Sequence, residues 1–387
     1  MNDVSIAIPS TYYKASKYEP MLKRLGGRLS RAYGIGYPRN YVFTDEPKNK
    51  MVLFKWPVYI GQKIVKPLCE FFSLPSYYAY IVNCVLCDWI ISKKISKDKA
   101  RVLYTSPFMV RTIKVAKKRG MVVILEAGNS EPKRENARIS NDYVYFNIKK
   151  QYIYGRTWFM NSCCKGFSLC DGIISISNVS LNTFLEAGFP KGKTHLIPLT
   201  GTDFKIANFE DVFEKKKAFI STAYHSFIKG THRLLLAWKK AQITDVPLFI
   251  VGPLCEDMKE FVNKYGPFDN VVFLGHQSDL GNFYSTRDAV GVLLSLSEGA
   301  VRVTPEMMSY GFPMIVSPDA TCDLIENGKN GFVVNPLNED EIVEKLNFFA
   351  EDWNRVHQLR KTVIDSVKYR TTKDWANEVA DYLITKC

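Results

Sequence analysis

The sequence predicts an α/β protein of two doubly wound domains that face each other across a cleft. The chain has 387 residues, more than one compact core usually holds, so its size favours two domains of roughly 200 residues each. Short strands that are apolar throughout alternate with helical segments, and this alternation runs twice along the chain. Such a pattern is typical of parallel sheets that helices cover on both faces.

The first run of strands fills the first half of the chain. Its strands are separated by helical segments such as 111–120, which has helical charge spacing and ends at a glycine, and 178–188. The expected strands are 4–9, 100–106, 121–127, 171–177 and 193–199. We therefore expect a first domain at residues 1–204.

The pattern restarts after a polar linker at 205–217. The segment 230–241 reads as an amphipathic helix with Leu234, Leu235 and Trp238 on one face. The expected strands of this half are 218–224, 247–252, 271–275, 289–295, 313–317 and 331–335. We expect a second domain at 205–370, and a last helix at 371–387 that packs back on the first domain.

The positive charge of the chain is concentrated in its first half. Residues 1–200 contain 31 Lys and Arg against 13 Asp and Glu, a net charge of +18, whereas residues 201–387 contain 21 against 26, a net charge of −5. General solubility does not explain this asymmetry. A basic first domain favours a partner that is anionic, such as nucleic acid, anionic lipid or a phosphorylated ligand.

The cysteines and the first residues point to a reducing compartment. Nine cysteines without a disulfide-like spacing are expected to be buried free thiols, including the Cys84–Cys87 pair. The first ten residues show neither the basic nor the apolar region of a secretory signal. No Asp-x-Asp follows an apolar strand, so we expect no metal and no cofactor.

Two stretches of the first half could meet a membrane. The window 73–91 contains Pro75, Asn83 and Asp88, so we interpret it as a helix buried in a soluble core rather than a span. The stretch 54–80 mixes lysines with aromatic residues, which suits either a membrane surface or the edge of a core.

The segment 297–317 holds two glutamates, Glu298 and Glu306, on either side of an expected helix start. Glu298 follows an apolar strand, Thr304 is a good N-cap residue, and Pro305 suits the first turn. The start of a helix favours phosphate. Because carboxylates repel phosphate, we expect both glutamates to accept hydrogen bonds from hydroxyl groups beside it, as in a nucleotide sugar.

The motifs of residues 171–387 resemble the retaining GT-B glycosyltransferases of family 4, the group 1 type. The resemblance rests on five blocks in order: the segment 173–204, Lys229-Gly230, the strand-ending Gly252 and Phe273-Leu274-Gly275, the E-x7-E of Glu298 and Glu306, and the run "ENGKNGFVVNP" at 326–336. Residues 1–170 match this family only in the rhythm of their strands. The resemblance implies two Rossmann-like domains, an acceptor-binding one followed by a nucleotide-sugar-binding one.

The resemblance also implies roles for individual residues. Lys229 would neutralise the donor pyrophosphate and, with Glu298, serve catalysis; a cation there stabilises the charge that develops on the leaving group. Glu306 would bind the ribose hydroxyls and Glu298 the hydroxyls of the donor sugar. The remaining donor-binding positions would be backbone N–H groups facing the distal phosphate and residues near the base: Ala300, Val301, Gly252 and His276.

This sequence departs from the family at several places, of which three concern the expected site residues. An arginine usual before the Lys-Gly pair is missing, and His225 or Arg302 would supply its charge, unless that charge is absent. The loop after the first glutamate reads Gly-Ala-Val instead of Gly-Phe-Gly. Glu126 and Asn129 stand where the first domain of the family often has a histidine, and we expect them on the acceptor side.

Together these features predict a metal-independent retaining hexosyltransferase that uses a nucleotide-diphosphate sugar. We prefer front-face attack to a covalent intermediate on Glu298. The basic first domain favours a lipid-linked saccharide acceptor, and thus a cytoplasmic enzyme on the inner face of the membrane in surface polysaccharide biosynthesis. Two alternatives remain: a soluble small-molecule acceptor, or a catalytically weak nucleotide-sugar-binding protein. No nucleic-acid-binding motif is present.

Overall fold

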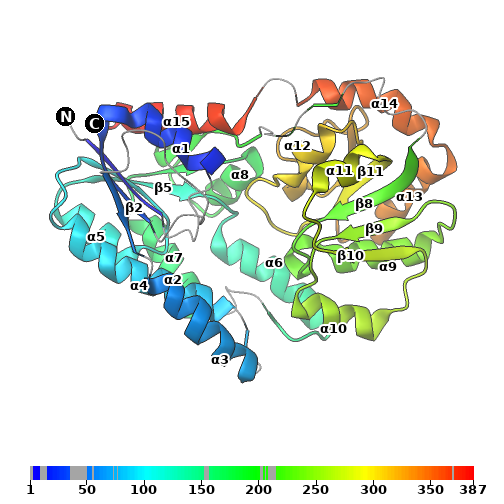
Figure 1. Cartoon of the computed structure of the whole chain (residues 1–387), viewed down its shortest axis with the longest axis horizontal. Helices are drawn as coiled ribbons and strands as arrows, with labels where there is room; N and C mark the ends of the chain where they lie inside the picture. Colours follow the sequence, from blue (N-terminus) through cyan, green and yellow to red (C-terminus); the bar gives the residue numbers. More distant parts are fainter. Residues whose placement is uncertain are drawn as a thin grey trace.

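The structure is a computed structural model that describes residues 3–8, 15–34, 50–54, 56–72, 74–75, 77–151, 157–200, 204, 206–207, 215–367 and 370–387. The chain forms two parallel sheets with helices on both faces of each, which confirms the predicted fold class (Figure 1). The predicted linker at 205–217 lies largely outside the described residues, and the boundary at 204/205 stays a prediction.

The first sheet has the strand order β3-β2-β1-β4-β5-β6-β7, and all its pairs are parallel. Its strands are β1 Val4–Ala7, β2 Leu29–Gly34, β3 Met51–Leu53, β4 Val102–Thr105, β5 Val122–Ala127, β6 Gly172–Ser175 and β7 Thr194–Leu196. One face packs on α1 (Ala15–Leu25) and α15 (Thr372–Thr385). The other face packs on α4 (Tyr77–Ile95), α5 (Val110–Lys118), α7 (Thr157–Leu169) and α8 (Asn178–Glu186).

The second sheet has the order β10-β9-β8-β11-β12-β13 and is also parallel. Its strands are β8 Lys216–Thr222, β9 Leu248–Val251, β10 Val271–Gly275, β11 Arg287–Leu293, β12 Met314–Val316 and β13 Gly331–Val333. Its helices are α9 Thr231–Ala241, α10 Glu256–Tyr265, α11 Leu280–Ser285, α12 Val303–Met308, α13 Glu339–Glu351 and α14 Asn354–Asp365. Leu234, Leu235 and Trp238 of α9 are buried, as the amphipathic pattern predicted.

Helix α15 returns to the first sheet after the second is complete (Figure 1). It begins with a capping box between Thr371 and Asp374, which supplies partners to backbone groups at its first turn. The buried Trp375 donates from Nε1 to the carbonyl of Ile197 at 3.0 Å. Apolar burial on α1 and β1 therefore attaches the end of the chain to its beginning.

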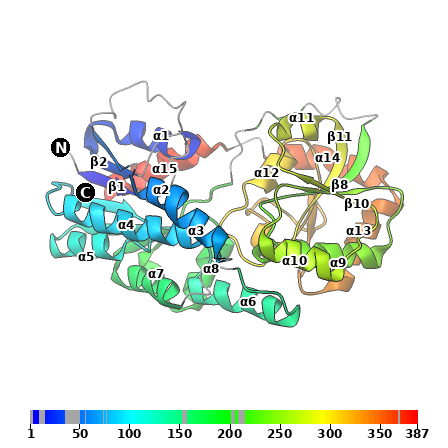
Figure 2. The same cartoon turned by 60° about the horizontal axis from the view of Figure 1, so that its bottom comes forward.

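Helix α6 (Pro132–Tyr145) comes from the first half of the chain but packs into the core of the second sheet. Ile139, Tyr143 and Phe146 share a core with Phe219 and Phe227. Figures 1 and 2 show α6 between the two sheets, close to α10 and α9. The first half of the chain therefore does not fold on the first sheet alone, a departure from the domain division that the sequence suggested.

The segment 73–91 is largely helical, within α4, and Asn83 and Asp88 are buried, as the sequence analysis expected. Across the described residues, we find no helix both long and apolar enough to cross a bilayer. All nine cysteines are free thiols and six are buried, which confirms the prediction for Cys84 and Cys87. No group of potential metal ligands occurs among the described residues.

Candidate functional site

Lys229 and Glu298 meet at the carboxyl ends of the strands of the second sheet. Lys229 ends a short 3-10 turn (Phe227–Lys229) after β8, and Glu298 lies in the loop after β11. The Lys229 ammonium group forms an ion pair with Oε1 of Glu298, and the hydroxyl of Ser295 donates to the same oxygen at 3.0 Å. The structure thus joins the two predicted catalytic residues into one charged pair, at the edge of a parallel sheet where ligands usually bind.

The turn after Lys229 depends on a glycine. Gly230 has a φ of 66°, and a Cβ atom there would lie 1.9 Å from the carbonyl oxygen of Leu294 in β11's following loop. Only glycine tolerates both the left-handed backbone and the close approach. A glycine after Lys229 is therefore required by packing, because it lets the turn of Lys229 lie directly against the loop of Glu298.

Glu306 lies in the first turn of α12, among aromatic residues. Burial raises the pKa of Tyr284, and the nearby charges of Glu306 and Tyr310 raise it further. Burial also raises the pKa of Tyr310, again with a contribution from Glu306. Glu306 is therefore partly buried and lies within electrostatic range of the two tyrosines, Tyr284 and Tyr310.

The start of α12 differs from the sequence prediction. The helix begins at Val303, and Arg302 occupies the cap position without a side-chain capping bond. Thr304 is fully buried inside the helix, and its hydroxyl donates to the carbonyl of Ala320 at 2.7 Å. The prediction of Thr304 as N-cap was wrong, because a tertiary acceptor takes the hydroxyl that a local cap would have used.

Ala300 and Val301 connect the two cores. Ala300 packs against the core of the first sheet, whereas Val301 is buried in the core of the second. Arg302 follows, half-buried and close to Cys322. Burial raises the pKa of Cys322 to about 12, and the charge of Arg302 offsets part of that rise. The loop is thus held at both ends by apolar contacts.

His225 is buried and cannot carry the charge of the missing arginine. Its Nε2 donates to the carbonyl of Val251 at 3.1 Å, and its Nδ1 lies 2.8 Å from the hydroxyl of Thr231. Burial lowers the pKa of His225 to about 4, so the ring is neutral at physiological pH. This corrects the expectation that His225 supplies that charge. Its role is to tie the loop after β8 to the end of β9.

Gly252 and His276 lie at the ends of β9 and β10. Gly252 donates its N–H to the carbonyl of Gly275 at 2.8 Å, and its φ is 122°. A Cβ atom at Gly252 would meet the carbonyl oxygen of Ala223 at 1.9 Å. His276 follows with an exposed side chain. Both positions lie at the same edge of the sheet as Lys229, as predicted.

Glu126 and Asn129 lie at the carboxyl end of β5 in the first sheet. Oε2 of Glu126 accepts hydrogen bonds from the hydroxyls of Tyr104 at 2.8 Å and Tyr18 at 3.0 Å. Asn129 has an exposed side chain, and its carbonyl accepts from Ser180 at 2.8 Å. These strand-end residues therefore lie on the first sheet's side of the site.

The two sheets touch through the loops at 128–130 and 298–299. The hydroxyl of Ser130 donates to the backbone carbonyl of Glu298 at 3.2 Å. A Cβ atom on Gly299 would lie 2.0 Å from the carbonyl oxygen of Gly128. The loop that carries the donor-side glutamate therefore rests directly on the acceptor-side loop.

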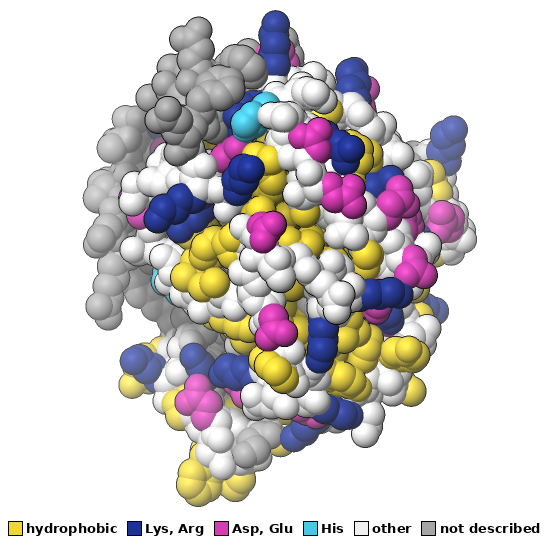
Figure 3. Space-filling view, turned by 90° about the vertical axis from the view of Figure 1, so that its right-hand side faces the viewer, with side chains coloured by type: hydrophobic (Ala, Val, Ile, Leu, Met, Phe, Trp, Pro, Cys, Tyr) yellow, Lys and Arg dark blue, Asp and Glu magenta, His cyan; other side chains and the backbone are white. Residues whose placement is uncertain are grey.

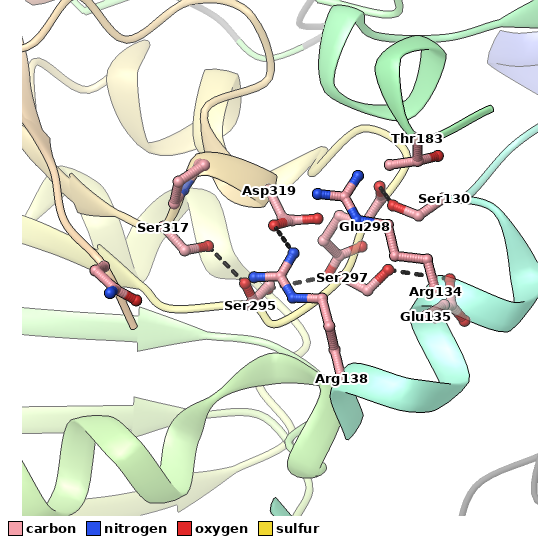
Figure 4. Close-up of polar contacts among 12 residues, drawn as sticks. Ser130, Arg134, Glu135, Arg138, Thr183, Ser295, Ser297, Glu298, Ser317 and Asp319 are labelled. Carbon is pink, nitrogen blue, oxygen red and sulfur yellow. Dashed lines mark hydrogen bonds and ion pairs between the residues drawn. The ribbon is translucent and has the colours of Figure 1, made fainter. Parts of the chain in front are cut away.

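Helix α6 adds charged residues that the sequence analysis missed (Figure 4). Arg138 forms an ion pair with the buried Asp319 at 2.7 Å, and Arg134 lies one turn earlier on the same helix. Burial raises the pKa of Asp319; the positive charges of Arg138 and Arg134 oppose this, and the charge of Glu298 adds to it. Asp319 therefore lies within electrostatic range of Glu298 and is bound to α6 through Arg138.

The N-terminal turn of α6 also contacts the loop of Glu298 directly. The hydroxyl of Ser297 donates to Oε2 of Glu135 at 3.1 Å, and both residues are buried. The helix starts at Pro132 with Glu131 as its N-cap, which accepts from the N–H of Arg134. A Glu followed by Pro was a local signal for this helix start, but nothing in the sequence tied the helix to the second sheet.

Comparison with known proteins agrees with this geometry. Residues 203–365 match the family described as Glycosyl transferases group 1. An uncharacterized glycosyltransferase of Haemophilus influenzae is 24% identical over 191 residues, which are 47% of this chain and 52% of that relative. The chain thus spans about half the length of this curated relative.

Solved structures share the arrangement of the whole chain. Anabaena Alr3699/HepE, solved in complex with UDP and glucose, has a TM-score of 0.64 at 16% identity and covers 100% of both chains. Sucrose-phosphate synthase of Thermosynechococcus elongatus has a TM-score of 0.66 at 14% identity, over 100% of this chain and 99% of that one. Residues 203–365 thus match the group 1 glycosyl transferases, and the chain as a whole shares the two-domain GT-B fold of these solved structures.

Proposed function

We propose that this protein is a retaining hexosyltransferase that works without a metal. It moves a sugar from a nucleotide-diphosphate donor to a lipid-linked saccharide at the inner face of the cytoplasmic membrane, in surface polysaccharide biosynthesis. The observation that carries the donor half is the Lys229–Glu298 pair at the strand ends of the group 1 domain, with Glu306 on the next helix.

In this proposal the donor lies across the strand ends of the second sheet. Lys229 neutralises the pyrophosphate, and Arg302 adds a second positive charge. Backbone N–H groups of Ala300 and Val301 face the distal phosphate. A hydrogen bond to a charged group contributes roughly 1.5–3 kcal/mol, and we assign Lys229 a contact of that size. Gly252 and His276 border the base.

The two glutamates bind hydroxyl groups at opposite ends of the phosphates. Glu306 accepts from the ribose hydroxyls, and Glu298 from the sugar that is transferred. Because Lys229 pairs with Glu298, one side chain connects the phosphate and the sugar positions. We propose front-face attack, in which the leaving phosphate oxygen takes the proton of the acceptor hydroxyl; a trapped glycosyl-Glu298 adduct would contradict this route.

The acceptor half rests on the first sheet. Glu126 and Asn129 lie at its strand ends, on the other side of the contact between the loops at 128–130 and 298–299. The net charge of +18 in residues 1–200 attracts a pyrophosphate-linked acceptor and an anionic bilayer. By contrast, Figure 3 shows acidic and basic side chains interspersed on the outer face of the second domain.

A screen of thermal shifts over sugar nucleotides tests the donor site first, because a ligand of the folded state raises the Tm. The sugar nucleotide that binds is then assayed for slow release of its nucleoside diphosphate. We expect this release to be lost in Glu306→Ala and Lys229→Ala, and kept in the exposed controls Glu344→Ala and Lys329→Ala. Equal turnover in all four variants would overturn the assignment, and binding without any turnover would favour a catalytically weak protein.

A further inference from the structure

Exposed large hydrophobic side chains gather in one part of the first domain. Ten of the seventeen in the described part of the chain lie between Trp56 and Trp89. Apolar side chains scattered singly over a surface are ordinary, but a contiguous cluster marks an interaction site. The cluster centres on a helix that Figures 1 and 2 show at the outer edge of the domain, along α4.

This helix is continuous from Trp56 to Phe71, with a π-helical turn in its middle. It consists of α2 (Trp56–Ile60), a π segment (Gly61–Val65) and α3 (Lys66–Phe71), and the residues at the junctions keep helical backbone angles. A π turn contains more residues than an α turn. It therefore shifts which side chains share a face.

The side facing α4 is identified by its buried residues. Residues 57, 61 and 69 are buried and 65 is partly buried, at a regular spacing of four. A Cβ atom on Gly61 would lie 2.3 Å from Oδ1 of the buried Asn83, so the helix approaches α4 very closely at this glycine. This contact fixes which sides of the helix face outward.

An apolar stripe lies along one outward side. Its members are Trp56, Tyr59, Ile64, Leu68, Phe71 and the adjoining Phe72, all exposed, Phe71 by 81%. Their spacing is three or four residues, except for the five between Tyr59 and Ile64, where the π turn lies. In a regular α-helix this step would turn the later residues away from the earlier ones. The π turn keeps the stripe continuous.

A polar stripe runs beside it, with Gln62, Lys63, Lys66 and Glu70. Glu70 lies 3.8 Å from Lys66, so Lys63 carries the net positive charge of this stripe among the described residues. A lysine-bearing face beside a face of Trp, Tyr, Phe and Leu is the pattern of a helix that lies in the plane of a bilayer interface. Trp and Tyr prefer the headgroup level.

We propose that the helix Trp56–Phe71 lies in the headgroup region of an anionic bilayer, with the apolar stripe among the acyl chains. This deepens the proposed function by assigning the membrane contact to particular side chains. It differs from attraction by the basic surface alone, because burial of apolar side chains persists when salt screens the charges. Residues 1–200, which include this helix, carry a net charge of +18, and this charge is complementary to that of an anionic bilayer.

Flotation with phosphatidylcholine vesicles that contain phosphatidylglycerol tests the proposal, at low salt and at about 1 M NaCl, where the Debye length falls to about 3 Å. We expect binding to weaken at high salt but to persist. The triple variant Ile64→Ser, Leu68→Ser, Phe71→Ser should bind on the order of 1,000-fold more weakly at both salt concentrations, since each of the three inserted side chains contributes roughly tenfold.

The matched control is Val144→Ser, Val272→Ser, Leu337→Ser, which removes three exposed apolar side chains outside the helix Trp56–Phe71. It should float like the wild type, and both triple variants should keep the wild-type Tm and donor release. Trp fluorescence should be quenched by lipids brominated on their acyl chains, and Trp56→Phe should remove part of that quenching.

The outcomes separate the two proposals. Equal flotation of the two triple variants overturns the membrane role of the stripe, whereas donor release then still supports the enzyme. Loss of a dimer in sedimentation by the stripe variant, with flotation unchanged, would make the stripe an interface between two copies and overturn the proposal as well. Retained flotation in a protein without donor release would instead overturn only the proposed function.

Discussion

The hydroxyl of Ser130 lies 3.2 Å from the backbone carbonyl of Glu298 and donates a hydrogen bond to it, across 168 residues of sequence. The next residue, Gly299, lies against Gly128, the backbone two residues before that serine. The loop of the first sheet and the loop of the second are therefore in direct contact at the residue that we propose for sugar binding. The position of Glu298 depends on both halves of the chain.

Gly299→Ala should reduce donor turnover. Its Cβ atom would lie 2.0 Å from the carbonyl oxygen of Gly128 and 3.0 Å from the backbone nitrogen of Asn129, so backbone must move. A displacement of about 1 Å at a reacting group can cost on the order of 100-fold in rate. We expect a loss of that order in kcat/KM. Gly192→Ala is the control, because nothing lies within 4 Å of its Cβ; equal rates in both variants would contradict the prediction.

Lys229→Ala should abolish the preference for a diphosphate over a monophosphate. If Lys229 contacts the pyrophosphate, its loss weakens the binding of a nucleoside diphosphate by roughly 10- to 100-fold and leaves the monophosphate nearly unchanged. Glu306→Ala should instead weaken both nucleotides equally, because both carry the ribose. Isothermal titration with the nucleotide found in the donor screen measures both. If Lys229→Ala weakens the binding of the diphosphate and the monophosphate equally, Lys229 does not contact the pyrophosphate.

Much of the fold could be predicted because its signals are local. Strands buried on both faces are apolar throughout, and helix α9 shows its buried side in the spacing of Leu234, Leu235 and Trp238. The placement of Glu298 at a strand end was predicted from the apolar strand before it, and that of Lys229 from the family resemblance. The ion pair between them was not predicted.

The rest depended on contacts that no local pattern records. Thr304 has the sequence of a helix cap, but the distant carbonyl of Ala320 takes its hydroxyl. His225 follows a strand, where an exposed residue is expected, but its ring is buried and contacts Thr231 and Val251 through its two nitrogens. Helix α6 lies between β5 and β6 of the first sheet in the chain but packs into the core of the second sheet. This brings Arg138 beside Asp319, and no local pattern signals that contact.

His225 should make the protein less stable in acid. Its pKa is about 4 in the folded protein, against about 6.5 in an unfolded chain. Above pH 6.5 both states are neutral; as the pH falls from 6.5 to 4 only the unfolded state takes up the proton, so stability is lost, in total about 3 kcal/mol. We measure the free energy of unfolding of the wild type and of His225→Gln with urea. The difference between the two should shrink as the pH falls from 6.5 to 4. A difference independent of pH would mean that His225 does not titrate in this way.

Asp142 should be the residue whose loss releases α6 from the second sheet. It is buried and accepts from Nε2 of His232 at 2.7 Å and from Nη2 of Arg233 at 2.6 Å, while the neighbouring Tyr143 donates to the buried Asp257 at 2.6 Å. These pairs cross from the first half of the chain to the second. They anchor the C-terminal end of α6, whose N-terminal end contacts the loop of Glu298.

Removing one partner of a buried ion pair costs about 3–5 kcal/mol, because it leaves the other charge without compensation, whereas exposed pairs contribute about 0–1 kcal/mol. We therefore expect Asp142→Ala to lower the free energy of unfolding by several kcal/mol, and Asp340→Ala, which breaks an exposed pair with Lys240, to change it by less than about 1 kcal/mol. Urea unfolding measures both. Hydrogen exchange should speed up in α6 in the first variant alone; if α6 stays protected there, another contact anchors the helix, and the assignment of Asp142 is wrong.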